Sequence, residues 1–388
     1  MTQSDTPIIV KRFLNWKETA DVSKRAAAAS ALARAFLQSD MVFEERCAAE
    51  AALTDLMDDP SPRVRLSIAE ALAISPRAPE QILVALLCDR FDIASLIAVR
   101  SPRIRETDLI DRVRFGDPRL QVLIAQRPEV GRMLALALVR FAGPEAACAL
   151  LENRNARVCA ECRKILVDRF AEDSQVRAIL FNVKALEPLL RYRLLVAVNK
   201  ALAENSFVTG LLGHHRACGT ADAALQTALV QLLDGVHGAD CVKFVGELRE
   251  DGRLTTALIM RAACHGYLDF IGAVVADLSG LAREMVIDAF ASAREAQLRG
   301  VFGKAGLTEK VAHVLSTAVR EWRAVSQGRS HAGAQEITYA IMDAVGSSNQ
   351  AHDHANDDIE GLLRSIYLDE VRKNALSHAR AVATAHAA

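Results

Sequence analysis

The residues from Asp58 to Ala73, DDPSPRVRLSIAEALA, carry the sequence signals of one complete amphipathic helix. Ser61 can cap a helix N-terminus with its hydroxyl, and Pro62 suits the first helical position, where a missing N–H costs nothing. Apolar residues then follow at helical spacing in one stripe, at Val64, Ile68, Ala71 and Leu72. A helix with one apolar stripe has to pack on neighbours, so this stretch predicts one member of an array of helices.

The start of this helix returns once along the chain, because SPRVR at 61–65 is matched by SPRIR at 101–105. The two motifs are 40 residues apart. A repeat of that length, built from helix pairs, is typical of α-solenoids. No stretch alternates apolar and polar residues over the length of a strand, so we expect no β-sheet. The sequence therefore predicts an all-α fold: a HEAT-like α-solenoid whose helix pairs form a right-handed superhelix, with a C-terminal helical extension.

The positions of the prolines separate two kinds of helical segment, since all ten prolines lie at or before residue 188. Short helices begun by proline come first, and longer helices separated mostly by glycines follow. The change falls near 185–205 and marks either two domains or two styles of repeat in one continuous curve. The predicted segments are an N-terminal cap or tail at 1–23, HEAT-like repeats at 24–188, a proline-free helical part at 189–330, and C-terminal helices at 331–388 that include a polar linker at 346–358.

The sequence lacks the signals of export and membrane insertion. The N-terminus has no apolar run of about 7 to 15 residues, as a secretory signal requires. Every purely apolar run is far shorter than the roughly 20 residues of a membrane-spanning helix. Eight cysteines are spread through 388 residues without a dense framework, which favours reduced thiols. We therefore expect a cytoplasmic protein without disulfides and without membrane contact.

Arginines near helix starts are the main candidates for a binding surface. Between residues 60 and 200 there are 23 Lys and Arg, 20 of them Arg, against 16 Asp and Glu, although the whole chain has a net charge of −1. Such arginines could line one edge of a solenoid and bind phosphates or an acidic protein. Alternatively, each pairs with an acid of a neighbouring repeat. The acids well placed for pairing are Asp58, Asp59, Asp89, Asp92 and Asp117. The candidate arginines for anion or partner binding are Arg63, Arg65, Arg103, Arg105, Arg112 and Arg119.

The cysteines at 159 and 162 form a CxxC, which elsewhere marks redox or zinc sites. Residues 155–170 around it predict a helix, and a zinc site needs about four ligands, whereas no second CxxC is present. We therefore interpret Cys159 and Cys162 as core cysteines.

Other clusters of metal-binding residue types have simpler interpretations. One cluster belongs to the predicted polar linker and comprises His352, Asp353, His354, Asp357 and Asp358. A second comprises His214, His215 and Cys218. A hidden enzyme site around Cys264, His265 and Asp269 would rest on residue types alone. No HExxH, GxxxxGK[ST] or GxGxxG motif is present. We predict no catalytic residue, no metal and no cofactor.

Several segments together resemble a known family. They are LLCDRFDIASLIAVRSPRIRETDLID at 86–111, LIAQRPEV at 123–130, LLENRNARV at 150–158, LREDGRLTTALIMRAACHGYLDFIGAVVADLSG at 248–280 and VFGKAGL at 301–307. With these segments the chain resembles an uncharacterised alphaproteobacterial family with HEAT-like helices, over roughly residues 24–307, and the part after 330 lies outside the likeness. The resemblance implies an all-helical, cytoplasmic bacterial protein, and it carries over no catalytic or binding residue.

The leading functional hypothesis is a non-enzymatic scaffold or adaptor that binds an unknown protein partner on the solenoid surface. The alternative is nucleic-acid binding through the Arg-rich face, with a role in DNA repair, because some HEAT-like proteins are DNA glycosylases. The charge near zero and the scarcity of Trp and Tyr count against that alternative. The amphipathic segment from Ile359 to His386 is expected either to dock on the array or to form a homo-oligomer.

Overall fold

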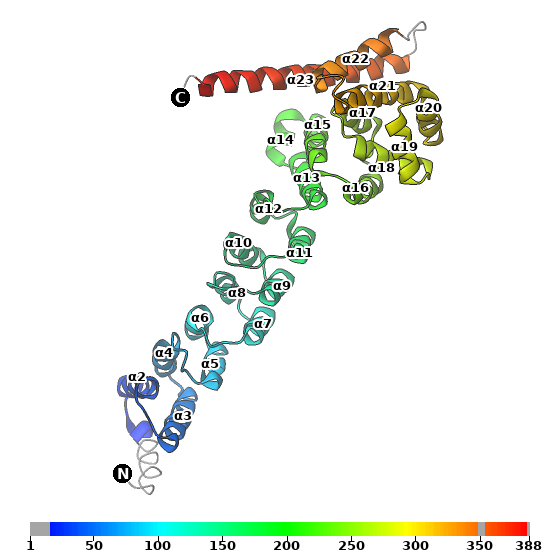
Figure 1. Ribbon diagram of the computed structural model, residues 1–388. Coiled ribbons are helices and arrows are strands. Elements are labelled where there is room, and N and C mark those ends of the chain that lie inside the picture. Colours follow the sequence, from blue (N-terminus) through cyan, green and yellow to red (C-terminus); the bar gives the residue numbers. More distant parts are fainter. Residues whose placement is uncertain (1–15, 348–353, 386–388) are drawn as a thin grey trace. The chain divides into compact units, whose positions relative to one another are not determined.

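The computed structural model, shown in Figure 1, describes residues 16–347 and 354–385. Over these residues it contains helices and no strand, apart from a single isolated bridge between Val130 and Ala156. The all-α prediction is confirmed. By contacts within the chain, the protein divides into two compact units, Met1–Leu186 and Glu187–Ala388.

Unit 1 is a two-layered stack of helices, in which alternate helices contact each other within one layer. One layer consists of α2 (Val22–Gln38), α4 (Pro62–Leu72), α6 (Phe91–Arg100), α8 (Pro118–Ala125), α10 (Pro144–Glu152) and α12 (Ser174–Phe181). The other consists of α3 (Phe43–Met57), α5 (Glu80–Leu87), α7 (Glu106–Phe115), α9 (Arg132–Phe141) and α11 (Ala160–Phe170). This is the arrangement of a helical repeat, with apolar side chains such as Ile68 and Leu83 fully buried in it.

Proline begins several helices as the sequence predicts. Pro62, Pro118, Pro144 and Pro188 all occupy the first turn of a helix. The missing N–H is harmless there, because the first N–H groups of a helix have no partner inside the helix. These helix starts are therefore fixed by local chemistry.

The match between SPRVR and SPRIR, in contrast, does not mark equivalent positions in the repeat. Ser61 precedes α4, whereas Ser101 ends α6 and donates its N–H to the Ile97 carbonyl. Both serines are extended, with ψ of 116° and 121°, because a following proline disfavours helical backbone. An extended residue can either precede a helix or terminate one, so the motif is ambiguous.

The true period of the repeat is shorter than the separation of the two motifs. From α4 onward the helices of the first layer begin at positions 62, 91, 118, 144 and 174. Only α2 and α4, which begin at positions 22 and 62, are as far apart as SPRVR and SPRIR. The SPRIR segment lies in the turn before α7, in the other layer, so the period predicted from the two motifs is wrong beyond the first pair.

Unit 2 has its own core. Its helices are α13 (Pro188–Ala203), α14 (Ser206–Leu212), α15 (His214–Leu232), the 3₁₀ turn η1 (Leu233–Gly235), α16 (Ala239–Glu250), α17 (Thr256–Cys264), α18 (Leu268–Ser279), α19 (Arg283–Ser292), α20 (Glu295–Lys304), α21 (Glu309–Ser326), α22 (Ala334–Ser347) and α23 (His354–Ala385). Of these, α15, α21 and α23 are longer than any described helix of unit 1. At the centre, the ring of Phe244 packs edge-on against Tyr192 and Phe270.

The C-terminal helix α23 is docked along part of its length. Leu363 and Ile366 are buried in the core of unit 2, whereas the helix is exposed from Arg372 to Val382. The linker predicted at 346–358 is helical at both ends, because α22 continues to Ser347 and α23 begins at His354. Polar composition does not exclude helix, since a solvent-facing helix can be polar. The middle of that linker, 348–353, lies outside the described residues, as do residues 1–15 of the predicted N-terminal segment.

No helix among the described residues is long and apolar enough to cross a membrane.

Candidate interaction surface

Three of the six candidate arginines are bound by carboxylates. Arg65 forms a bidentate pair with Asp89, with Nε at 2.5 Å and Nη2 at 2.9 Å, and it also donates to the Asp59 carbonyl. Arg105 pairs with Glu80 on α5. Arg119 pairs with Asp117, the N-cap residue of α8, at 2.6 Å.

The other three lie on different elements. Arg63 is exposed on α4, Arg103 is exposed in the turn before α7, and Arg112 is half-buried on α7. Their side chains make no hydrogen bond or ion pair with the described part of the chain. The six therefore belong to both layers of unit 1, and the binding role of the unpaired three stays a prediction.

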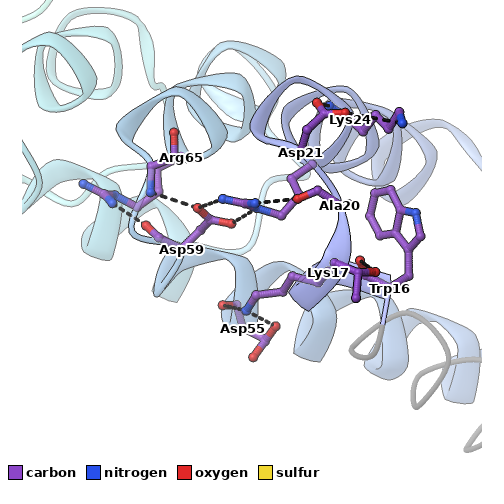
Figure 2. Close-up of polar contacts among 11 residues, drawn as sticks. Trp16, Lys17, Ala20, Asp21, Lys24, Asp55, Asp59 and Arg65 are labelled. Carbon is purple, nitrogen blue, oxygen red and sulfur yellow. Dashed lines mark hydrogen bonds and ion pairs between the residues drawn. The ribbon is translucent and has the colours of Figure 1, made fainter.

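The most deeply buried carboxylate among the ion pairs of unit 1 is that of Asp59 (Figure 2), which is 1% exposed. Arg25 of α2 donates to both its carboxylate oxygens, at 2.7 and 3.1 Å, and the Ser61 N–H donates to Oδ1. Burial raises the pKa of Asp59, but these hydrogen bonds outweigh burial and lower the pKa below its ordinary value. Nearby, Lys17 pairs with Asp55 at 2.6 Å and attaches the chain preceding α2 to the end of α3.

Other arginines of the basic segment cap helices. Arg127 donates to the Ala98 and Ser101 carbonyls at the end of α6, and Arg169 donates to the Val139 and Ala142 carbonyls at the end of α9. The last carbonyls of a helix lack partners inside it, so each arginine supplies hydrogen bonds to the buried end of a helix in the neighbouring repeat. Much of the positive charge in the basic segment is therefore structural.

Among the described residues, no group of three or more His, Cys, Asp or Glu side chains could hold a metal ion. His214 Nε2 and Cys218 Sγ are 3.7 Å apart on α15. His352 and Asp353 lie outside the described residues, as do the side chains of His354 and Asp357.

The three residues considered for an enzyme site, Cys264, His265 and Asp269, do not contact one another as a nucleophile and a base would. Cys264 is fully buried, and burial raises the pKa of its thiol to about 11. His265 contacts Glu370 of α23, with Nε2 and Oε1 3.0 Å apart, and stacks on Tyr267. Asp269 is exposed on α18. No nucleophile and base are therefore paired among them.

The CxxC lies at a helix start and not inside a helix. Cys159 is the N-cap residue of α11 and is half-buried, whereas Cys162 lies in the first turn and is fully buried. The prediction of core cysteines is therefore right for Cys162 and wrong for Cys159. The helix predicted from residue 155 begins only at Ala160, because the preceding loop is held in extended form by the bridge from Ala156 to Val130.

A feature that the sequence prediction missed is an Arg-Phe pair at the end of three successive helices of one layer. The pairs are Arg114-Phe115 on α7, Arg140-Phe141 on α9 and Arg169-Phe170 on α11. They recur once in every repeat of this part of the chain, at the true period of the helices. This recurrence is the signal that could have revealed them.

The first two pairs form an exposed aromatic surface. Phe115 is 80% exposed and Phe141 is 45% exposed. The guanidinium carbon of Arg114 is 5.0 Å from the Phe141 ring centroid and 6.0 Å from that of Phe115. Contact between α7 and α9 brings these residues together. We call Arg114, Phe115 and Phe141 the Arg114 platform.

Comparison with models of known protein families identifies the family of this chain. Residues 93–353 match the family described as uncharacterised protein conserved in bacteria, DUF2336. The chain belongs to this family. The DUF2336 match starts later than the predicted 24 and extends past 307 and 330, so the predicted extent of the likeness is wrong at both ends, whereas the alphaproteobacterial origin stays a prediction. The match includes the Arg114 platform and the CxxC of α11, but not Arg63 and Arg65. Among curated proteins and among solved structures, no protein matches the chain.

Proposed function

We propose that this DUF2336 protein is a non-enzymatic adaptor of the bacterial cytoplasm that binds a protein partner at the Arg114 platform. The observation that carries the proposal is the pair of exposed phenylalanines from neighbouring repeats with one arginine close to both rings. All eight cysteines are free thiols, which supports a reducing compartment.

Burying the platform would be favourable for binding. Full burial of a Phe side chain contributes about 1.5 to 3 kcal/mol relative to full exposure, so Phe115 offers most of that amount and Phe141 about half. Arg114 makes no ion pair with a described carboxylate, so its charge is available to a ligand. Aromatic residues and Arg are enriched at the energetic centres of protein interfaces. A matching partner would present an apolar side chain beside a carboxylate.

The same groups could stack on a nucleic-acid base, but the charge pattern favours a protein. Phosphate binding needs several unneutralised cations along one path. Arg65, Arg105 and Arg119 are neutralised by carboxylates, and Arg140 beside the platform pairs with Glu161 at 2.6 Å. The unpaired candidates Arg63, Arg103 and Arg112 lie on different elements, on α4, in the turn before α7 and on α7. A protein surface with one carboxylate requires only Arg114.

The test is site-specific photocrosslinking in the native bacterium. A photoreactive phenylalanine analogue replaces Phe115 in one strain and Phe43 in another, because Phe43 on α3 is equally exposed at 79% but lies far from the platform in the sequence. We expect one defined protein to crosslink from position 115 and not from 43, with at least a tenfold loss when Phe141→Ala and Arg114→Ser are added.

Crosslinks from both positions to the same proteins, or from neither, would overturn the proposal. Nucleic acid crosslinked from position 115 and lost steeply as salt rises would establish the nucleic-acid alternative instead.

A further inference from the structure

The two cysteines at the start of α11 have their sulfurs in contact. Cys159 Sγ and Cys162 Sγ are 3.4 Å apart across the first turn of the helix. A disulfide requires about 2.05 Å, so the sulfurs need to approach by only about 1.4 Å. Cys159 is the N-cap residue and its backbone is extended (φ −80°, ψ 174°), so its position relative to Cys162 is not fixed by helical backbone angles.

The electrostatics differ sharply between the two thiols. Burial raises the pKa of Cys159, but hydrogen bonds from the Cys162 N–H and thiol and from the Glu161 N–H outweigh it, and Arg132 adds a favourable charge, so its pKa is lowered. Burial and donation to Cys159 raise the pKa of Cys162 to about 11. Cys159 therefore loses its proton more readily than Cys162.

The two cysteines also differ in their exposure to solvent. Cys159 is half-buried and can be reached from solvent, whereas Cys162 is fully buried. The loop carrying Cys159 is fixed by the Arg157 N–H, which donates to the Val130 carbonyl at 3.0 Å. An external oxidant can therefore meet Cys159 first, with Cys162 held in place behind it.

We infer that Cys159 and Cys162 are a redox-active dithiol of this protein, with Cys159 as the attacking thiol, Cys162 as the resolving thiol and a hydroperoxide as the oxidant. The Cys159 thiolate attacks the outer peroxide oxygen, the O–O bond breaks, and the leaving oxygen takes a proton to give an alcohol or water. The product is a sulfenic acid on Cys159.

The second step closes the disulfide. Cys162 loses its proton and attacks the Cys159 sulfur, the S–O bond breaks, and the hydroxyl leaves with the proton as water. Overall, one hydroperoxide and two thiols give one disulfide, one alcohol or water molecule, and one water. Exchange with a small thiol reverses the change.

The experiment uses the full chain, reduced and then treated with stoichiometric hydrogen peroxide. We expect the intact mass to fall by about 2 Da and peptide mapping to show a Cys159–Cys162 bond. In C162S, a sulfenic acid that reacts with dimedone should accumulate on Cys159. In C159S, Cys162 should stay unmodified. Cys47 and Cys88 are the internal control, because both are exposed single cysteines in the same molecule. Their oxidation should be at least tenfold slower than that of Cys159.

The inference fails if Cys47 or Cys88 reacts as fast as Cys159, or if Cys159 is oxidised to sulfinic acid without a disulfide to Cys162. The measurement on the unaltered chain decides both points, so it does not depend on the folding of either variant. The result is also independent of the crosslinking test of the Arg114 platform.

Discussion

Replacing Arg65 with Met tests whether the basic segment is structural. Met retains an apolar stem of similar length but removes the guanidinium that binds both oxygens of Asp89 and the Asp59 carbonyl. The Asp89 carboxylate would keep only the Arg90 N–H. Removing one partner of a fully buried pair costs about 3 to 5 kcal/mol. Because the side chains of Arg65 and Asp89 are still 15% and 11% exposed, water offsets part of the loss, and we expect about 2 to 3 kcal/mol.

The matched control is Arg63→Met, the same substitution two residues earlier on α4. Arg63 is exposed and its side chain has no hydrogen-bond or ion-pair partner in the described chain, so the change should stay within about 0.5 kcal/mol. Hydrogen exchange of the α4 and α5 amides, followed over a urea series, measures the stability of this part of unit 1. Equal effects of the two substitutions would refute the structural assignment of Arg65.

The pH dependence supplies an independent check. Burial raises the pKa of Asp89, but the hydrogen bonds from Arg65 and the Arg90 N–H outweigh it and lower the pKa. The pairing therefore stabilises the fold above the ordinary carboxyl pKa of about 3.9 and is lost as the pH falls through the lower folded-state value. The stability difference between the unaltered chain and Arg65→Met should shrink below about pH 4. A difference that persists at lower pH would mean that charge is not the cause.

Two further substitutions test the packing of unit 2 by chemical denaturation. Gly266 has a φ of +80°, and a Cβ there would lie 2.8 Å from the Trp322 ring, so Gly266→Ala should cost about 2 to 4 kcal/mol, whereas Gly306→Ala, at φ +72° with open space, should cost about 1 to 2 kcal/mol. Equal losses of stability in Gly266→Ala and Gly306→Ala would show that the Trp322 ring moves to make room for the added methyl group. Phe302 is fully buried between helices, so Phe302→Ala should cost about 3 to 5 kcal/mol, and Phe207→Ala, at 74% exposure, should stay within about 0.5 kcal/mol. A small loss of stability in Phe302→Ala would mean that neighbouring side chains move into the space left by the ring.

Local sequence chemistry predicts the elements well but not their pairing. Pro118 at the start of α8 and the apolar stripe of Val64 and Ile68 act within a few residues, and the helices follow from them. The Ser-Pro at 101 shows the limit, because the same extended serine ends one helix where Ser61 begins another. The motif itself cannot decide between the two, because Val64 and Ile104, at the same place in each copy, are both buried.

For the candidate site as well, the sequence shows the features set by residue type but not those set by contacts between helices. Arginine abundance is visible in the sequence, but Arg65 finds Asp89 in the turn after the next helix, and Arg63 on the same helix finds no partner in the described chain. The Arg-Phe pairs could have been found from their recurrence at 114 and 140. The exposure of Phe115 and Phe141 and the position of Arg114 close to both rings could not have been found from the sequence.

The sequence by itself therefore determined the fold class, the helix starts at Pro62, Pro118, Pro144 and Pro188, and the excess of arginine, because these depend on residue type and on neighbours within one or two turns. Only the tertiary structure decided the true period of the repeat, the partners of each arginine and the contact of Cys159 with Cys162. Burial and pairing depend on which helices stack on each other. That stacking is set by the total apolar area buried across the layers, which no single segment of the chain encodes.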